Sequence, residues 1–335
     1  MRLEDSILLK VVNLRKYFEI KRGLFSKPLM VKAVDGVSFE LGKGEAISLV
    51  GESGSGKTTL AKTILRLYEP TDGTLIFNGK DITHLNAKNL MWYRKTVQLV
   101  QQDPFGSLPY FLTIREILEE PLRIHKIGDE RSRDELVYKA LENVRLLPAE
   151  DFLPKYPHMI SGGQAQRVAI ARALILQPEL IVADEPVSML DASVRVEILM
   201  LLRELQENRK ISFIYVTHDL STSRYFSDKI FIMYAGHIVE KAATLEILRE
   251  PLHPYTIALF EAIPDPDPSN VRRRRKTPVG EPPSLLDPPL GCRFHPRCPH
   301  AKDICRKKEP PEVEVSKLHT VKCWLFAQED SEGGA

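Results

Sequence analysis

The sequence contains the stretch Leu49-Val50-Gly51-Glu52-Ser53-Gly54-Ser55-Gly56-Lys57-Thr58-Thr59-Leu60, which fits the pattern G-x-x-x-x-G-K-[ST] from its first glycine to its first threonine. The apolar run Ala46–Val50 before it is typical of a buried strand, and the apolar residues after it recur at helical spacing. A strand, a glycine-rich loop and a helix in this order bind phosphate, because backbone N–H groups and the helix N-terminus surround the anion. The stretch therefore predicts a nucleotide-binding site.

Two side chains of this loop have specific expected roles. Lys57 is expected to contact the β- and γ-phosphates, and Thr58 is expected to bind Mg²⁺. A glycine-rich turn with a solvated lysine is the alternative, and the flanking strand and helix argue against it. The loop residues expected to surround the phosphates are Gly51, Glu52, Ser53, Gly54, Ser55, Gly56, Lys57, Thr58 and Thr59.

The composition is that of an ordinary soluble protein, and we expect the chain to be intracellular. The chain has 335 residues, of which 43% are hydrophobic and 27% charged, so one large or two unequal domains are expected. The net charge of +2 gives no argument for a nucleic-acid partner. No apolar run is long enough to cross a bilayer, and residues 1–5 lack the apolar core of a signal peptide.

Polar side chains follow three predicted strands, and ligands of open α/β sheets gather at such strand ends. Residues 180–183 end in Asp184 and Glu185, which suit a Mg²⁺ ligand and a group that orients a water, with structural ion pairing as the alternative. Gln102, after residues 97–100, is expected to reach Mg²⁺ or that water, unless it is a solvated loop residue. His218, after residues 213–216, is a candidate contact for the γ-phosphate, although a lone histidine is usually structural.

A second helix start carries the features of an anion site. Residues 116–147 have helical periodicity and predict a helical insertion that leads to Ser161-Gly162-Gly163-Gln164. Ser161 is a good N-cap for a helix that runs to about residue 176. A capped helix with two flexible glycines is one interpretation, and a second grip on a phosphate is the other.

Two neighbouring aromatic side chains lie in the N-terminal part of the chain. Tyr17 and Phe18 are expected on a loop between strands at residues 7–12 and 34–41, where one ring stacks on a nucleotide base or packs in the core.

Residues 264–289 are rich in proline and include the basic run 272–276. That run is most simply a solvated linker, with contact to anionic lipid as the weaker alternative.

The four cysteines of the chain are Cys292, Cys298, Cys305 and Cys323. In a reducing compartment such a cluster favours metal binding over disulfides. Their spacing lacks the paired C-x-x-C of common zinc sites, but four thiolates suit either Zn²⁺ or an iron–sulfur cluster. Four buried cysteines without a ligand are the remaining alternative.

Together these motifs resemble those of the ATP-binding-cassette (ABC) ATPases over residues 7–252. The phosphate loop is similar to the family's Walker A element, Ser161-Gly162-Gly163-Gln164 to its signature, and Asp184-Glu185 to its Walker B end. Residues 188–191, which end in Asp191, are similar to the D-loop. Gln102 matches the Q-loop glutamine and His218 the switch histidine. Phe18, with Tyr17 second, matches the base-stacking aromatic.

The resemblance implies an α/β fold. It consists of a P-loop NTPase core with a helical insertion at about 104–175 and an antiparallel β edge, all within residues 6–256, followed by a small cysteine-containing extension at 257–335. Residues 156–158, 253–256 and 291–298 look like the peptide-importer branch of the family. Gln101, Ala165 and Met189 differ from the residues common in that branch, and residues 107–111 lack its usual asparagine. These departures concern the surface that docks membrane subunits.

The resemblance also implies a mechanism. ATP and Mg²⁺ are the expected cofactors, with Glu185, His218, Gln102 and Lys57 as catalytic groups. Thr58, Gln102 and Asp184 are the expected Mg²⁺ ligands. The nucleotide is expected between the phosphate loop of one subunit and the signature residues and Asp191 of another. Two ATPase subunits then close head to tail around ATP, and a heterodimer with a paralogous chain is the first choice.

The implied machine is an importer. Its other parts are two integral membrane permease subunits and an extracytoplasmic substrate-binding protein, which places this chain peripherally on the cytoplasmic face of the membrane. Di- and oligopeptides are the expected cargo, with oligosaccharide or nickel as alternatives. A soluble ABC ATPase outside transport is the rival class. In similar tails a [4Fe–4S] cluster is held by four cysteines, here Cys292, Cys298, Cys305 and Cys323, and zinc is the alternative.

Overall fold

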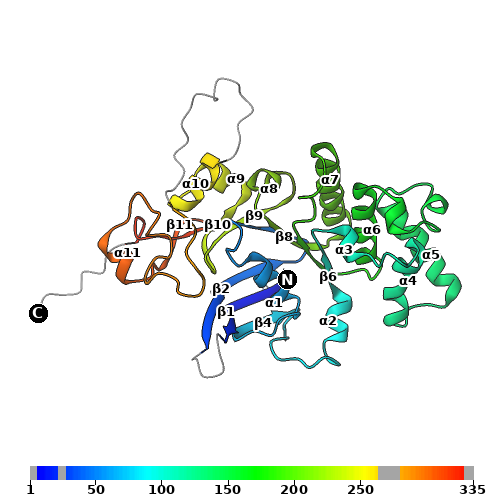
Figure 1. Ribbon diagram of the computed structural model, residues 1–335, viewed down its shortest axis with the longest axis horizontal. Helices are drawn as coiled ribbons and strands as arrows, with labels where there is room; N and C mark the ends of the chain where they lie inside the picture. Colours follow the sequence, from blue (N-terminus) through cyan, green and yellow to red (C-terminus); the bar gives the residue numbers. More distant parts are fainter. Residues whose placement is uncertain (1–5, 22–27, 263–279, 328–335) are drawn as a thin grey trace, which may run out of the picture.

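The computed structural model describes residues 6–21, 28–262 and 280–327. Strand β3 (Ala46–Val50), which precedes the phosphate loop, lies inside an eight-stranded sheet of order β11-β12-β10-β9-β3-β8-β7-β6 (Figure 1). Its other members are β6 (Val97–Val100), β7 (Leu180–Asp184), β8 (Ser212–Thr217), β9 (Lys229–Tyr234), β10 (His237–Ala243), β11 (Glu312–Ser316) and β12 (His319–Lys322). Strands β6, β7, β8, β3 and β9 run parallel. Every residue of β3 and β8 is buried, which explains why these strands are continuous apolar runs in the sequence.

A second, antiparallel sheet has the order β2-β1-β4-β5. Its strands are β1 (Ile7–Ile20), β2 (Leu29–Gly42), β4 (Asp72–Phe77) and β5 (Lys80–Asp81). One hydrophobic core joins this sheet to helix α1 (Lys57–Ile64) and to β3, through residues such as Leu14, Leu60 and Leu49. The predicted antiparallel edge is therefore present.

Strand β1 is longer than predicted and includes the two aromatic residues expected on a loop. Tyr17 and Phe18 do not lie on a loop, because β1 continues past residue 12 and pairs with β2 as far as Ile20↔Leu29. Several register shifts interrupt this long pairing. They explain why the alternation of apolar and polar residues is weak after residue 12.

The predicted helical insertion forms a second core, shared with helices on that side of the main sheet. Helix α4 (Ile114–Ile124) begins with a capping box between Thr113 and Glu116, and α5 (Glu130–Asn143) is capped by Asp129. In Figure 1 this group lies at the opposite end of the molecule from α11 (Asp303–Lys307). The remaining helices are α2 (Met91–Thr96), α3 (Pro104–Ser107), α6 (Gly162–Leu174), α7 (Ala192–Arg209), α8 (Leu220–Phe226), α9 (Thr244–Arg249) and α10 (Pro254–Ala262), with 3₁₀ turns η2 (Ala149–Asp151) and η3 (Pro157–Met159).

The C-terminal residues 280–327 contribute strands β11 and β12 to the main sheet. Strand β12 pairs with β10, with Val321 opposite Glu240. The buried Glu240 accepts backbone N–H groups of Leu252 and His253, and its Oε1 lies 2.8 Å from Nε2 of His319. The basic run 272–276 falls outside the described residues. None of the helices in the described ranges is both long and apolar enough to span a membrane.

Candidate nucleotide-binding site

The phosphate loop packs closely against the backbone of strands β9 and β2. A Cβ at Gly51 would lie 2.1 Å from the carbonyl oxygen of Met233, and one at Gly56 would lie 2.1 Å from that of Ala33. Gly56 also has φ of +105°, which favours glycine. The N–H of Gly236 donates to the carbonyl of Ser55 at 2.8 Å. Because of these contacts, the loop keeps its shape only with glycine at positions 51 and 56.

Lys57 lies inside the loop, at the start of α1. Its side chain is buried, and Nζ donates to the carbonyls of Gly51 at 2.7 Å and Glu52 at 2.9 Å. Burial lowers the pKa of Lys57, and the nearby carboxylates of Glu185 and Asp184 oppose that shift. The loop thus surrounds a desolvated positive charge, which suits an anionic ligand.

The ends of β3, β7 and β8 meet beside this loop. The parallel register places Asp184 opposite Val216 on β8, which in turn neighbours Leu49 on β3. Thr58 Oγ1 donates to Asp184 Oδ1 at 3.2 Å, so the two predicted Mg²⁺ ligands lie together. Burial raises the pKa of Asp184, and a bound cation would favour the carboxylate form.

The carboxylate of Glu185 and the ring of His218 also meet at this edge. Glu185 Oε1 lies 3.0 Å from Nδ1 of His218. The backbone of Glu185 is left-handed, with φ of +49°, and its N–H donates to the carbonyl of Val216. This turn directs the chain away from the sheet just after β7. The structure therefore brings Lys57, Thr58, Asp184, Glu185 and His218 to one sheet edge.

Gln102 follows β6 at this same end of the sheet, since Val100 at the end of β6 pairs with Ala183 on β7. Its side chain is exposed. Ser161 caps α6 and forms a capping box with Gln164, while Asp191 is the N-cap of α7. Helix α6, which begins at the Ser161–Gln164 turn, packs against α3, α4 and α5 of the helical group.

The aromatic pair on β1 has partners within the described chain. The hydroxyl of Tyr17 donates to Asp35, and burial together with this bond raises the pKa of Tyr17 to about 12. The ring of Phe18 meets that of Tyr68 edge-on, with 5.3 Å between the centroids. Both rings are half-buried, so each keeps an accessible part. The base-stacking role of Phe18 stays a prediction.

Comparisons with known proteins agree with this geometry. A family profile described as "ABC transporter" matches residues 34–188, and one described as "Oligopeptide/dipeptide transporter, C-terminal region" matches residues 239–305. The chain is 46% identical over 323 residues to the oligopeptide transport ATP-binding protein AppF of Bacillus subtilis, covering 96% of this chain and 98% of that protein. The chain belongs to the ABC transporter ATP-binding proteins.

Further relatives support the same family. This ABC ATPase is 44% identical over 307 residues to the dipeptide transport ATP-binding protein DppF of Haemophilus influenzae, covering 92% of this chain and 93% of that protein. A dimeric ATP-binding cassette, MJ0796, bound to ADP and Pi superposes with a TM-score of 0.63 at 30% identity, over 71% of this chain and 99% of that one. CbiO1 of Clostridium perfringens gives a TM-score of 0.64 at 27% identity, over 73% and 92%. The predicted fold and ATPase class are confirmed, and with them the use of ATP and Mg²⁺.

The four cysteines of this ABC ATPase are unpaired and line one small cavity, together with His253 and Phe294. Burial raises the pKa of Cys292 to about 12 and that of Cys323 to about 11. Across residues 6–21, 28–262 and 280–327, no group of three or more His, Cys, Asp or Glu is placed to hold a metal ion. The predicted zinc or iron–sulfur site thus stays a prediction.

Sequence reasoning assigned no role to three further residues. His253 is buried in the wall of the cysteine cavity, and within the described chain its Nε2 has no hydrogen-bond partner. Arg293 and Arg297, which lie between Cys292 and Cys298, bond to groups around the phosphate loop. Their position beside cysteines was visible in the sequence, but their partners lie far away along the chain.

Proposed function

We propose that this chain hydrolyses ATP to drive an importer of di- and oligopeptides. The observation that carries the proposal is the cluster of Lys57, Thr58, Asp184, Glu185 and His218 at one sheet edge. The names of its relatives AppF and DppF support peptides as cargo, ahead of oligosaccharide or nickel. We also propose that residues 6–256 form the ATPase domain, with a helical subdomain at about 104–175, and that residues 257–335 form a C-terminal extension.

The proposed chemistry follows from the geometry of that edge. Lys57 and the N-terminus of α1 hold the phosphates and stabilise the charge that develops on them during transfer. Glu185 orients a water for in-line attack on the γ-phosphate, and His218, 3.0 Å from it, contacts the same phosphate group. Thr58, Asp184 and Gln102 would hold Mg²⁺, which neutralises phosphate charge when bound.

We propose that ATP binds between two subunits arranged head to tail. Ser161, Gly162 and Gly163 begin α6, which packs within the helical group, and Asp191 is the N-cap of α7. We expect these helix starts to face the phosphate loop of a partner. The match to a cassette solved as a dimer supports the pairing of two subunits. Since importers of this branch often combine different ATPase chains, the partner is a paralogous subunit.

The membrane partners are two permease subunits, with a substrate-binding protein on the far side, so this chain sits on the cytoplasmic face. A groove of 290 Å³ between the end of β6, α4 and α6 supports a docking site for a permease segment. Its lining includes Arg94, Gln98, Gln101, Ile124, His125 and Arg172. This groove adjoins Gln102, so docking there would connect the membrane subunits to the nucleotide edge.

The importer function predicts co-purification and stimulation. We expect the affinity-tagged chain to bring down two integral membrane proteins from detergent-solubilised membranes. ATP hydrolysis by that complex is expected to rise several-fold when the substrate-binding protein is added with a peptide mixture. Stimulation by oligosaccharide or nickel but not by peptides would contradict the proposed cargo, and hydrolysis by a chain found only in the soluble fraction would contradict transport.

We also propose that the four cysteines hold a [4Fe–4S] cluster. All of them line one cavity, and the orphaned Nε2–H of His253 offers that cavity a hydrogen-bond donor. The N–H is on Nε2, because Nδ1 accepts the N–H of Tyr255 at 3.0 Å. Four thiolates are the ligand set of such a cluster, and the spacing of the cysteines lacks the paired C-x-x-C of common zinc sites.

The cluster proposal predicts a metal-dependent colour. Anaerobically purified chain is expected to be brown and to contain iron and labile sulfide in equal amounts. Cys305→Ser is expected to lose most of both, because the buried Cys305 is one of four ligands, while the exposed neighbouring change Arg306→Gln keeps them. Colourless protein with one zinc per chain, or with no metal, would contradict the cluster.

A further inference from the structure

The phosphate loop contains a carboxylate, which is unfavourable beside a triphosphate. Glu52 follows Gly51 in the loop, and its side chain is 28% exposed. Like charges at short range repel, so a carboxylate here needs a compensating cation. Arg297 provides one through a bidentate pair, with Nη1 donating to Oε2 at 2.9 Å and Nη2 to Oε1 at 3.1 Å.

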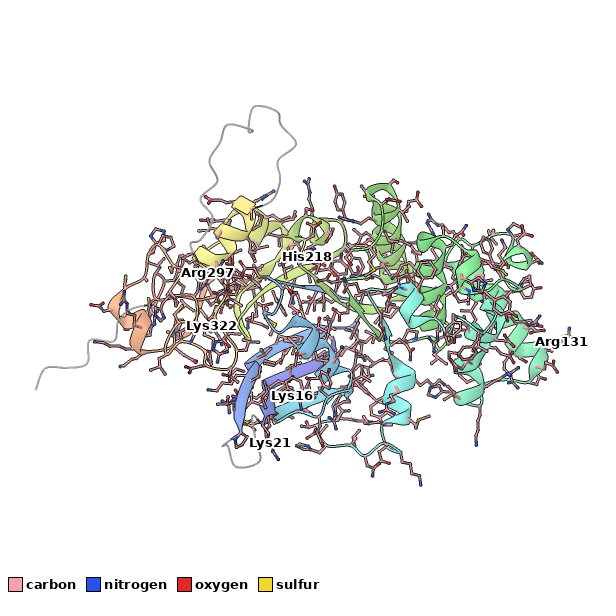
Figure 2. The ribbon with its side chains drawn as sticks, viewed as in Figure 1. Lys16, Lys21, Arg131, His218, Arg297 and Lys322 are labelled. Atoms are coloured by element: carbon pink, nitrogen blue, oxygen red, sulfur yellow. The ribbon has the colours of Figure 1, made fainter. Side chains whose placement is uncertain are left out.

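Arg297 is held in place by aromatic side chains. Its side chain is 8% exposed, and its guanidinium carbon lies 5.9 Å from the ring centroids of both Tyr234 and Phe294. The hydroxyl of Tyr255 accepts the backbone N–H of Glu52 at 2.8 Å, and the Tyr255 and Tyr234 ring centroids lie 4.5 Å apart. In Figure 2 Arg297 lies where the C-terminal segment meets the rest of the chain. The C-terminal segment therefore contacts the side chain of Glu52 through Arg297, and Tyr255 of α10 contacts its backbone.

Arg293 forms a second connection from the same segment. Its guanidinium is buried and donates to the carbonyl of Ala235 and to the carboxylate of Asp35. Gly236 follows Ala235 in the chain, and its N–H donates to the carbonyl of Ser55 in the phosphate loop at 2.8 Å. The carbonyl of Gly236 accepts the N–H of Asp35 at 2.9 Å. Arg293 thus stabilises the turn at residues 235–236, which is hydrogen-bonded to the phosphate loop.

We propose that Arg297 and Arg293 are positioning residues for ATP binding, and that the cysteine segment 291–298 holds the phosphate loop in its binding shape. Arg297 neutralises Glu52 and fixes its direction, and Arg293 fixes the 235–236 turn under Ser55. Neither arginine needs to touch the nucleotide. The proposal rests on the proposed nucleotide site, and it makes nucleotide affinity depend on Arg297, which lies 245 residues after Glu52 in the sequence.

The test is nucleotide affinity of the full chain, measured by titration with a fluorescent ATP analogue in Mg²⁺. Arg297→Gln is expected to weaken binding about tenfold, because a partly buried charged pair is replaced by an uncompensated carboxylate. The affinity of Arg297→Lys is expected to lie between those of the wild-type chain and Arg297→Gln, since lysine keeps the charge but not the bidentate geometry. The KM for ATP is expected to rise while kcat stays within about twofold, because Glu185 and His218 are unchanged.

Two comparisons separate this role from a loss of folding. Arg306→Gln, an exposed change beside Cys305, is expected to bind as wild type does. The double variant Glu52→Gln, Arg297→Gln is expected to recover most of the lost affinity, since the unpaired carboxylate is gone. Wild-type affinity in Arg297→Gln, or no recovery in the double variant, would overturn the proposal. Wild-type chain that binds no analogue would instead refute the nucleotide site itself.

Discussion

Replacing Glu185 with glutamine is expected to lower ATP hydrolysis at least about 100-fold and to leave binding of Mg-ATP nearly unchanged. An amide has the shape of the carboxylate but cannot orient a water by accepting its proton. The side chain is 19% exposed and lies 3.0 Å from the His218 ring, so its place at the end of β7 is fixed by the fold. Phosphate release in a steady-state assay measures the first effect, and titration with an ATP analogue measures the second.

A matched change tests whether the loss is specific. Glu246 is an exposed glutamate in the first turn of α9, away from the sheet edge, and Glu246→Gln is expected to hydrolyse ATP at the wild-type rate. If Glu185→Gln retained more than about a tenth of the wild-type rate, another group would have to activate the water.

Replacing Lys57 with alanine is expected to weaken Mg-ATP binding about 100-fold and to abolish measurable hydrolysis. The lysine is the buried cation at the centre of the loop, and its Nζ already bonds to two loop carbonyls at 2.7 and 2.9 Å. Its removal takes away both the charge that attracts the phosphates and a brace inside the loop. Titration with the same ATP analogue gives the affinity.

The control for this change is Lys43→Ala. Lys43 is exposed in the loop before β3, so its loss should leave affinity and hydrolysis unaltered. Thermal unfolding of both variants without nucleotide separates lost binding from lost structure. Tight ATP binding by a well-folded Lys57→Ala chain would mean that the phosphates lie outside this loop.

The sequence was sufficient to predict the parts of this site that are encoded locally. Strand Ala46–Val50, the glycine-rich loop and the helix after it follow one another directly in the chain. A single sequence motif therefore predicts all three. Asp184 and His218 could be placed near the loop because parallel strands end at the same sheet edge. Ser161 was recognisable as an N-cap for the same local reason.

Long-range contacts were not predictable from these patterns. The pairing of β12 with β10 and the bond from Arg297 to Glu52 join residues far apart in sequence, and no periodicity encodes them. The extension of β1 through Tyr17 and Phe18 depends on pairing with β2 rather than on the strand's own alternation. These contacts come from tertiary packing, which decides between conformations that the local sequence allows.

The central claim is that ATP joins two ATPase subunits and that hydrolysis releases them. The most direct test is the mass in solution of the Glu185→Gln chain, alone and mixed with the second ATPase subunit of its importer, in Mg-ATP and in Mg-ADP. We predict a dimer in Mg-ATP, in at least one of the two samples, and single chains in Mg-ADP. Single chains in both nucleotides, under conditions where bound ATP is demonstrated, would contradict the account.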